Sequence, residues 1–259
     1  MNLKSIESHI VNWLIDYSKK SGLNGFVVGV SGGIDSAVTS TLCAKTGLST
    51  IVLNMPIHQN PNQFKRSNEH INWITNNFEN VKSHEINLTD VYDSFSCALP
   101  KENQDELSMA NLRSRIRMSN LYVFASNKKY LVAGTGNKVE DFGVGFYTKY
   151  GDGGVDISPI ADLLKSEVFK IANHLGIVSS IQKAKPTDGL WDDDRSDEDQ
   201  LGATYDELEW AMNYLEVNSQ GNLSERQKKV LEIYSGHHQT NLHKMNPIPV
   251  CEIPKSLRS

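Results

Sequence analysis

The chain has 259 residues and a formal net charge of −5, with 22% charged and 39% hydrophobic residues. This composition is typical of a globular protein and argues against general disorder, while the negative charge argues against a basic surface for nucleic acid. No run of about 18 apolar residues occurs, which excludes a membrane-spanning helix, and residues 1–20 lack the apolar core of a signal peptide.

The cysteines are few and scattered. They stand at positions 43, 97 and 251, and no Cys-x-x-Cys pair exists. A disulfide scaffold or a zinc ribbon is therefore not expected. Reduced thiols are usual in the cytosol, so we expect a cytoplasmic protein.

Helices and strands alternate along the first half of the chain. Apolar residues at helical spacing, from Ile6 to Tyr17, predict an amphipathic helix. We expect Trp13, Tyr17 and, further along, Ile71 to pack in the core. The remaining elements of this half are predicted as strands at 26–30, 50–53, 81–86 and 130–133 and helices at 36–45, 65–78 and 105–126. This alternation predicts an α/β fold with a doubly wound parallel sheet and flanking helices.

The second half of the chain is richer in glycine and in helix-forming segments. Helices are predicted at 161–175, 204–215 and 225–235, followed by an extended tail at 246–254. The acidic run at 192–199 is typical of a solvated loop. His237, His238 and His243 lack the i, i+4 spacing of helical metal ligands, so we expect a polar surface turn there.

The loop after the first strand carries the clearest chemical signal. It reads Ser31-Gly32-Gly33-Ile34-Asp35-Ser36, between a buried strand and a helix. Its glycines let backbone N–H groups converge on an anion, and the helix N-terminus favours phosphate. Asp35 would repel that anion unless a cation lies between them, which points to Mg²⁺. A second loop, after residue 133, lies at the same edge of a parallel sheet, where ligands bind.

These segments resemble those of known enzymes. Ser-Gly-Gly-x-Asp-Ser is similar to the pyrophosphate loop of ATP pyrophosphatases, which cleave ATP between the α- and β-phosphates. That loop alone leaves the acceptor open. The segments 111–118, 134–140, 145–156 and 185–187, in this order, resemble the signature of ammonia-dependent NAD synthetase. The resemblance runs from about residue 28 to residue 244.

The resemblance implies ATP-dependent amidation of nicotinic acid adenine dinucleotide (deamido-NAD) by ammonia, through an adenylated intermediate, to NAD, AMP and pyrophosphate. It implies ATP and Mg²⁺ as co-substrate and cofactor, with Asp35 and Glu140 as the Mg²⁺ ligands. The segment after Glu140 is one residue longer than the family form, which leaves Asp141 open as an alternative ligand. The implied ATP-binding residues are Gly29, Val30, Ser31, Gly32, Gly33, Ile34, Asp35, Ser36, Thr135, Lys165 and Thr187.

The resemblance also implies a homodimer in which Arg115 reaches the partner's substrate. The implied deamido-NAD-binding residues are Asn111, Arg115, Lys149, Asp156, His243 and Lys244. Lys165 would offset the negative charge of the transition state. A buried carboxylate near the adenylate could take a proton from ammonium, and Asp152 is our candidate for this catalytic role. In the family, the segment at 192–199 closes over the substrates.

We therefore expect a single synthetase domain over residues 1–259, with a nucleotide-binding core at 1–180 and a mobile loop and helical part at 181–259. The synthetase motifs begin too early for a preceding glutaminase domain. Nucleic acid and membrane are not expected as partners. Two alternatives stay open: a pyrophosphate-loop enzyme with another acceptor, such as a tRNA base, and a non-catalytic ATP-binding module. The acidic charge argues against the first, and a pair of Mg²⁺ carboxylates against the second.

Overall fold

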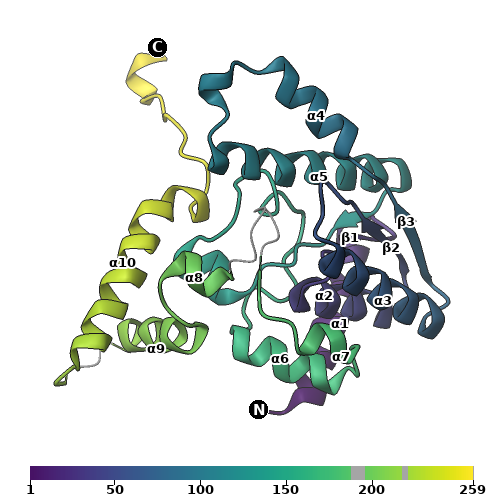
Figure 1. Cartoon of the computed structure of the whole chain (residues 1–259), viewed down its shortest axis with the longest axis horizontal. Helices are drawn as coiled ribbons and strands as arrows, with labels where there is room; N and C mark the ends of the chain where they lie inside the picture. Colours follow the sequence, from purple (N-terminus) through teal and green to yellow (C-terminus); the bar gives the residue numbers. More distant parts are fainter. Residues whose placement is uncertain (188–195, 218–220, 259) are drawn as a thin grey trace.

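The computed structural model describes residues 1–187, 196–217 and 221–258. These residues form one parallel sheet of four strands in the order β3-β2-β1-β4 (Figure 1). The strands are β1 (Gly25–Gly29), β2 (Ser49–Asn54), β3 (Val81–Glu85) and β4 (Leu131–Val132). In the register of the sheet, Val27 pairs with Ile51 on one side and with Val132 on the other. The predicted α/β fold is confirmed.

Helices cover both faces of the sheet because neighbouring strand residues point to opposite sides. Phe26 and Val28 pack with α1 (Leu3–Ser21), α2 (Ile34–Lys45) and α6 (Lys165–His174). Val27, between them, packs with α4 (Thr89–Ala98) and α5 (Glu106–Lys128) on the other face. Helix α3 (Pro61–Asn77) packs beside α2 over β2 and β3. The sheet is therefore doubly wound, as predicted.

A second group of helices forms its own core beside the sheet. The helices α8 (Asp197–Leu201), α9 (Tyr205–Glu216) and α10 (Glu225–Met245) pack against η2 (Val139–Val144), a π-helical segment (Figure 1). The short α7 (Ser179–Gln182) contacts the sheet core instead. Thr204 and Ser224 cap α9 and α10 through reciprocal capping boxes, which fixes where these helices begin.

Several predictions differ from the structure. Helix α4 was not predicted, and α10 continues to Met245, so the expected surface turn at His237 to His243 is wrong: these residues are helical. The expectation that Trp13 and Tyr17 are core residues is also wrong, since each is 39% exposed. Helix α1 packs through Ile10 and Leu14, and its two aromatic rings contact each other outside this core. Ile71 is buried as predicted.

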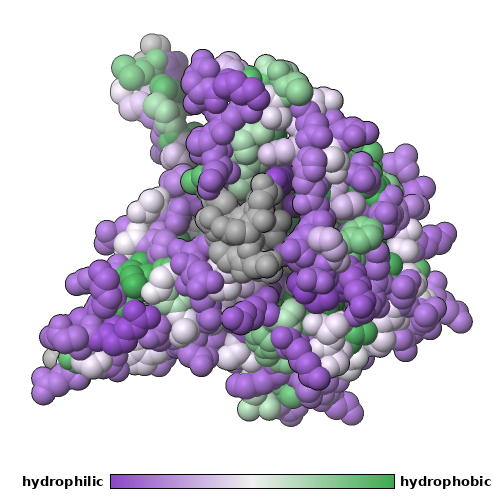
Figure 2. All heavy atoms as spheres, viewed as in Figure 1, coloured by the Kyte–Doolittle hydropathy of each residue, from purple (hydrophilic) through white to green (hydrophobic). Residues whose placement is uncertain are grey.

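The surface is polar over most of the face shown in Figure 2. None of the helices in the described part of the chain has the length and apolarity of a membrane span. The tail after α10 is extended and exposed up to the short η3 (Lys255–Leu257), and another short helix, η1 (Lys101–Asn103), connects α4 to α5. All three cysteines are free thiols; Cys43 is buried, whereas Cys97 and Cys251 are exposed.

His70 is a buried titratable residue between α2 and α3. Its ring is fully shielded from solvent, its Nε2 lies 2.9 Å from the Ser40 hydroxyl, and Trp73 stacks on it. Burial lowers the pKa of His70 to about 4, from an ordinary value of 6.5. The neutral ring is therefore the form that the folded protein stabilises.

We expect His70 to make the free energy of unfolding fall as the pH drops from 6.5 to about 4. The unfolded chain binds this proton more readily than the folded one, so the total loss is about 3 kcal/mol. Urea unfolding at a series of pH values measures it. His70→Gln keeps a hydrogen-bonding side chain without the titration, and its stability should depend less on pH; equal slopes in both proteins would contradict the prediction.

Candidate active site

The loop after β1 is shaped to bind an anion. Gly32 has a φ of +82°, and a Cβ atom there would fall 2.6 Å from the carbonyl oxygen of Gln63, so only glycine fits. The Ser36 hydroxyl accepts a hydrogen bond from Ser31 N (3.2 Å) and donates one to Gly33 O (3.0 Å). These bonds hold the loop at the N-terminus of α2, where free N–H groups and the helix dipole attract phosphate.

Lys165 joins three distant parts of the chain at the centre of the site. Its side chain is 4% exposed, and its Nζ donates to Asp35 Oδ2 at 2.7 Å and to Glu140 Oε1 at 2.9 Å. Asn137 Nδ2 donates to the second oxygen of Asp35 at 3.0 Å. The first turn of α2, the π-helical η2 and the start of α6 therefore meet at one buried ammonium group.

Lys165 and Glu140 stabilise each other's charge at this centre, whereas burial and the nearby Glu140 raise the pKa of Asp35. Burial opposes the charge of Lys165, but Asp35 and Glu140 outweigh it and raise the pKa of the lysine. Burial alone would raise the pKa of Glu140, yet Lys165 and a hydrogen bond from Tyr205 lower it overall. The lysine and Glu140 are therefore both held in their charged forms.

Tyr205 connects this centre to the C-terminal helices. Its hydroxyl donates to Glu140 Oε1 at 2.5 Å and lies 3.1 Å from Asp197 Oδ2. The backbone N–H of Asp197 donates to Pro186 O at 3.1 Å. Asp197 is 5% exposed, so the solvated loop expected for the acidic run is wrong at this residue. Half of the segment predicted to close over the substrates, residues 192–195 of 192–199, lies outside the described residues.

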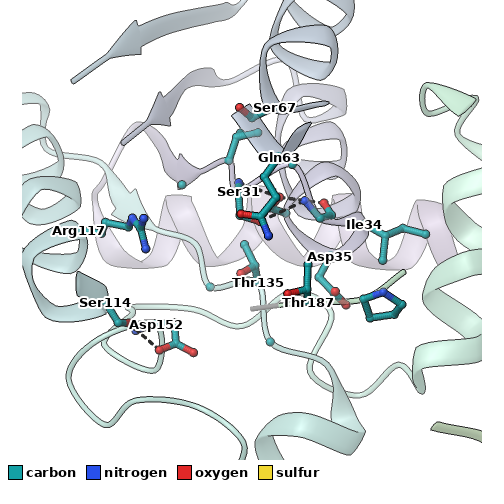
Figure 3. A pocket seen from close by; sticks show the side chains of 18 of the residues that line it. Ser31, Ile34, Asp35, Gln63, Ser67, Ser114, Arg117, Thr135, Asp152 and Thr187 are labelled. Carbon is teal, nitrogen blue, oxygen red and sulfur yellow. Dashed lines mark hydrogen bonds between the residues drawn. The ribbon is translucent and has the colours of Figure 1, made fainter. Parts of the chain in front are cut away.

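Two further carboxylates line the same pocket. Asp152 Oδ1 accepts hydrogen bonds from Ser114 Oγ (2.7 Å) and Thr148 N (2.9 Å), and burial raises the pKa of Asp152 (Figure 3). Asp141 packs against the backbone of Gly136. Burial, together with Glu140, Asp152 and Asp35, raises the pKa of Asp141 well above its usual value. This end of the pocket is therefore rich in carboxyl groups whose burial and mutual repulsion disfavour their charged forms.

The residues predicted for ATP, Mg²⁺ and catalysis all line one pocket, whereas those predicted for deamido-NAD lie outside it. The first group consists of Gly29, Val30, Ser31, Gly32, Gly33, Ile34, Asp35, Ser36, Thr135, Glu140, Asp152, Lys165 and Thr187. None of the six residues predicted for deamido-NAD lines it in the single subunit.

Four of those six residues form a connected group beside the pocket. Arg115 is exposed and donates to the carbonyl oxygen of Lys149 at 3.4 Å, and Lys149 Nζ donates to the carbonyl oxygen of His243 at 2.7 Å. Lys244 Nζ donates to Gly145 O and to Tyr147 O, both at 2.9 Å.

The other two predicted dinucleotide residues brace the backbone around this group. Asn111 Oδ1 accepts from Thr148 Oγ1 at 2.6 Å. Asp156 accepts from the Tyr122 hydroxyl (3.0 Å) and from Val132 N (2.8 Å), which fixes the end of β4.

Sequence reasoning missed the pocket residues after β2 and on α3. Asn54 ends β2, Met55 and Gln59 follow it, and Gln63, Arg66 and Ser67 lie on α3. The rule that ligands bind at the carboxyl edge of a parallel sheet applies to the strand at 50–53 as well, and it would have found the first three. The α3 residues carry no comparable local signal.

The two carboxylates of Asp35 and Glu140 suit Mg²⁺ better than a metal ion that takes all of its ligands from the protein. Within the described ranges, no group of three or more His, Cys, Asp or Glu side chains could hold a metal. Mg²⁺ commonly uses one or two carboxylates together with substrate phosphates. The oxygens of Asp35 and Glu140, both within 3 Å of the same ammonium group, match that donor set.

A parallel sheet whose first strand enters a Ser-Gly-Gly-x-Asp-Ser loop, with a buried lysine against two carboxylates, defines an α/β ATP-binding protein of the pyrophosphate-loop class. Comparison with known proteins narrows this class. A family model described as NAD synthase matches residues 6–247. The NH(3)-dependent NAD(+) synthetase of Carboxydothermus hydrogenoformans is 37% identical over 213 residues, which are 81% of this chain and 85% of that protein.

Two solved structures resemble the whole chain. NMN synthetase from Francisella tularensis has a TM-score of 0.84 and 32% identity, covering 98% of this chain and 99% of that one. The NH3-dependent NAD synthetase from Campylobacter jejuni, solved with a nitrate ion, has a TM-score of 0.79 and 26% identity, covering 97% of this chain and 100% of that one. The chain therefore belongs to the NAD synthase family.

Proposed function

We propose that this chain is a ligase that amidates deamido-NAD with ammonia and ATP, giving NAD, AMP and pyrophosphate. The observation that carries the proposal is the pocket in which the pyrophosphate loop, the Lys165 centre and Asp152 face one another. Relatives named NH(3)-dependent NAD(+) synthetase support the acceptor and the nitrogen donor. An RNA acceptor or a non-catalytic module is not favoured.

The reaction has two steps. ATP rests on the loop, and the carboxylate of the nicotinic acid ring attacks the α-phosphorus; the bond to the β-phosphate breaks, and pyrophosphate leaves. Lys165 lies at the loop, where a cation lowers the repulsion between these anions. Ammonia then attacks the carbonyl carbon of the adenylate, AMP leaves, and one proton is lost.

Asp35 and Glu140 are the residues that would hold Mg²⁺. Glu140 shares the Lys165 ammonium with Asp35, whereas Asp141 packs against Gly136, which favours Glu140 over Asp141 as the second ligand. When bound, the ion neutralises phosphate charge and orients the triphosphate.

Asp152 is the residue we assign to the proton of ammonium. Ser114 and Thr148 hold one of its carboxylate oxygens, which leaves the other to face a nitrogen donor. Its raised pKa makes this carboxylate a stronger base than an exposed aspartate.

A second candidate acceptor is nicotinic acid mononucleotide. The solved structure named NMN synthetase matches nearly the whole chain, and its product differs from NAD by the absence of the adenylate half. None of the six residues expected to bind the dinucleotide lines the pocket of one subunit, which also favours a smaller acceptor. Both acceptors carry the same carboxylate and need the same amidation chemistry.

We infer a homodimer that works in the cytoplasm, in which Arg115 serves the partner's site. Helix α4 exposes Val91 and Phe95, Leu99 is exposed just after its end, and α5 exposes Leu107 on the same covering layer as Arg115. Exposed apolar side chains of this kind often mark an interface between subunits. The free thiols support a reducing compartment, and the negative net charge argues against nucleic acid or membrane partners.

Product analysis tests the proposed function. Purified protein with ATP, Mg²⁺, ammonium and either acceptor should form AMP and the matching amide, separated by liquid chromatography. We expect a higher kcat/KM for deamido-NAD than for nicotinic acid mononucleotide. The reverse preference would select the second candidate. No amide from either acceptor would reject the synthetase activity.

Asp152→Asn should keep ATP binding and pyrophosphate release but lose about 100-fold in amide formation, because a neutral amide cannot accept the ammonium proton. Asn can still accept the hydrogen bonds from Ser114 and Thr148, so the fold should persist. Asp162→Asn is the matched control, since Asp162 is fully exposed. Full activity of Asp152→Asn would remove this residue from the mechanism.

Mixing two inactive variants tests the action of Arg115 across subunits. Lys165→Met and Arg115→Ala should each lose about 100-fold in turnover when assayed alone. Co-expressed in equal amounts, they should regain about a quarter of the normal activity, because half of the dimers then hold one intact site. Light scattering on the same samples reports the oligomeric state. Absence of regain in a dimeric sample would place Arg115 in its own subunit's site.

A further inference from the structure

Helix α3 lies directly against the pyrophosphate loop. A Cβ atom on Gly32 would fall 2.6 Å from Gln63 O and 3.0 Å from Ser67 N, so no side chain separates the two backbones. Arg66, between these residues, donates from Nε to Gly32 O at 3.4 Å. Gln63, Arg66 and Ser67 are all residues of the pocket wall. The loop therefore has a polar wall on its α3 side.

Arg66 brings uncompensated positive charge to this wall. Lys165, on the other side of the loop, is neutralised by Asp35 and Glu140. Across residues 1–187, 196–217 and 221–258, no ion pair joins Arg66 to a carboxylate. Its hydrogen bond to Gly32 is long, so its guanidinium can bind another acceptor.

The position of Asp152 indicates which part of ATP reaches Arg66. Figure 3 shows Gln63 beside Ser31, Ser67 of α3 beyond them, and Asp152 with Ser114 on the opposite side of Ser31 from Ser67. Under the proposed function, the acceptor carboxylate and ammonia meet on the Asp152 side. In a displacement at phosphorus, the leaving group departs opposite the attacking oxygen. The leaving pyrophosphate then points toward α3.

We propose that Arg66 binds the β- and γ-phosphates of ATP and stabilises the departing pyrophosphate. This role rests on the proposed function for its direction of attack. As the bond from the α-phosphorus to the bridging oxygen breaks, its electron pair passes to that oxygen of pyrophosphate. The planar guanidinium offers paired N–H donors to the oxygens that gain charge. Arg66 thus complements the backbone N–H groups of the loop with a full positive charge.

Binding measurements without acceptor test this role. Isothermal titration of ATP, pyrophosphate and AMP, each with Mg²⁺, compares the wild-type protein with Arg66→Ala and Arg66→Lys. Arg66→Ala should weaken ATP and pyrophosphate by about 10-fold or more, the effect of losing charge-assisted hydrogen bonds. AMP, which lacks both outer phosphates, should bind within about two-fold of wild type. Arg66→Lys should recover part of the loss.

Lys65→Ala is the matched control, because Lys65 precedes Arg66 on α3 but is exposed and does not line the pocket. It should bind all three ligands like the wild type. Unchanged binding of ATP and pyrophosphate by Arg66→Ala would overturn the proposal, as would an equal loss for AMP. If Arg66→Ala fails to fold, Arg66→Gln replaces it with the same expected losses. These titrations need no amide product, so they separate this role from the proposed function.

Discussion

Burial of the Lys165 ammonium is the constraint on which the site depends. An ammonium group taken out of water costs several kcal/mol unless its partners are in place. Those partners are Asp35 on α2 and Glu140 on η2, and neither is near α6 in sequence. The position of the loop at the start of α2 therefore depends on contacts with the glycine-rich segment around η2. Tyr205 extends this dependence to α9 through Glu140.

The two ends of the pocket differ in the groups that line them. Backbone N–H groups and Arg66 surround the loop at one end, whereas Asp141 and Asp152 lie at the other. Under the proposed function, the polyphosphate binds at the first end, and ammonium binds at the second end before it loses its proton.

The sequence predicted those parts of the molecule whose signals are local. Buried strand residues such as Val27 and Val28, and the loop from Ser31 to Ser36, could be recognised without knowledge of the fold. The contacts of Tyr205 and Asp197 could not, because they depend on how α8 and α9 pack against η2. Trp13 was misjudged for a related reason: helical spacing identifies an apolar stripe but not how much of its width the core covers.

The same limit applies to the histidines of α10. Their spacing argued against a metal site, yet it gave no sign that the helix continues through them. His238 Nδ1 lies 2.7 Å from the carbonyl oxygen of Gly143, so this residue serves to hold α10 against η2. The sequence does not predict this contact, because Gly143 and His238 are 95 residues apart in the chain.

The hydrogen bond from Asp197 N to Pro186 O has a consequence for the rim of the pocket. Pro186 and Asp197 both line the pocket, and the carboxylate of Asp197 lies against the Tyr205 hydroxyl that donates to Glu140. One residue thus joins the pocket rim at Pro186 to the centre at Lys165. A change in the position of the rim is therefore felt at the carboxylate that shares the buried ammonium group.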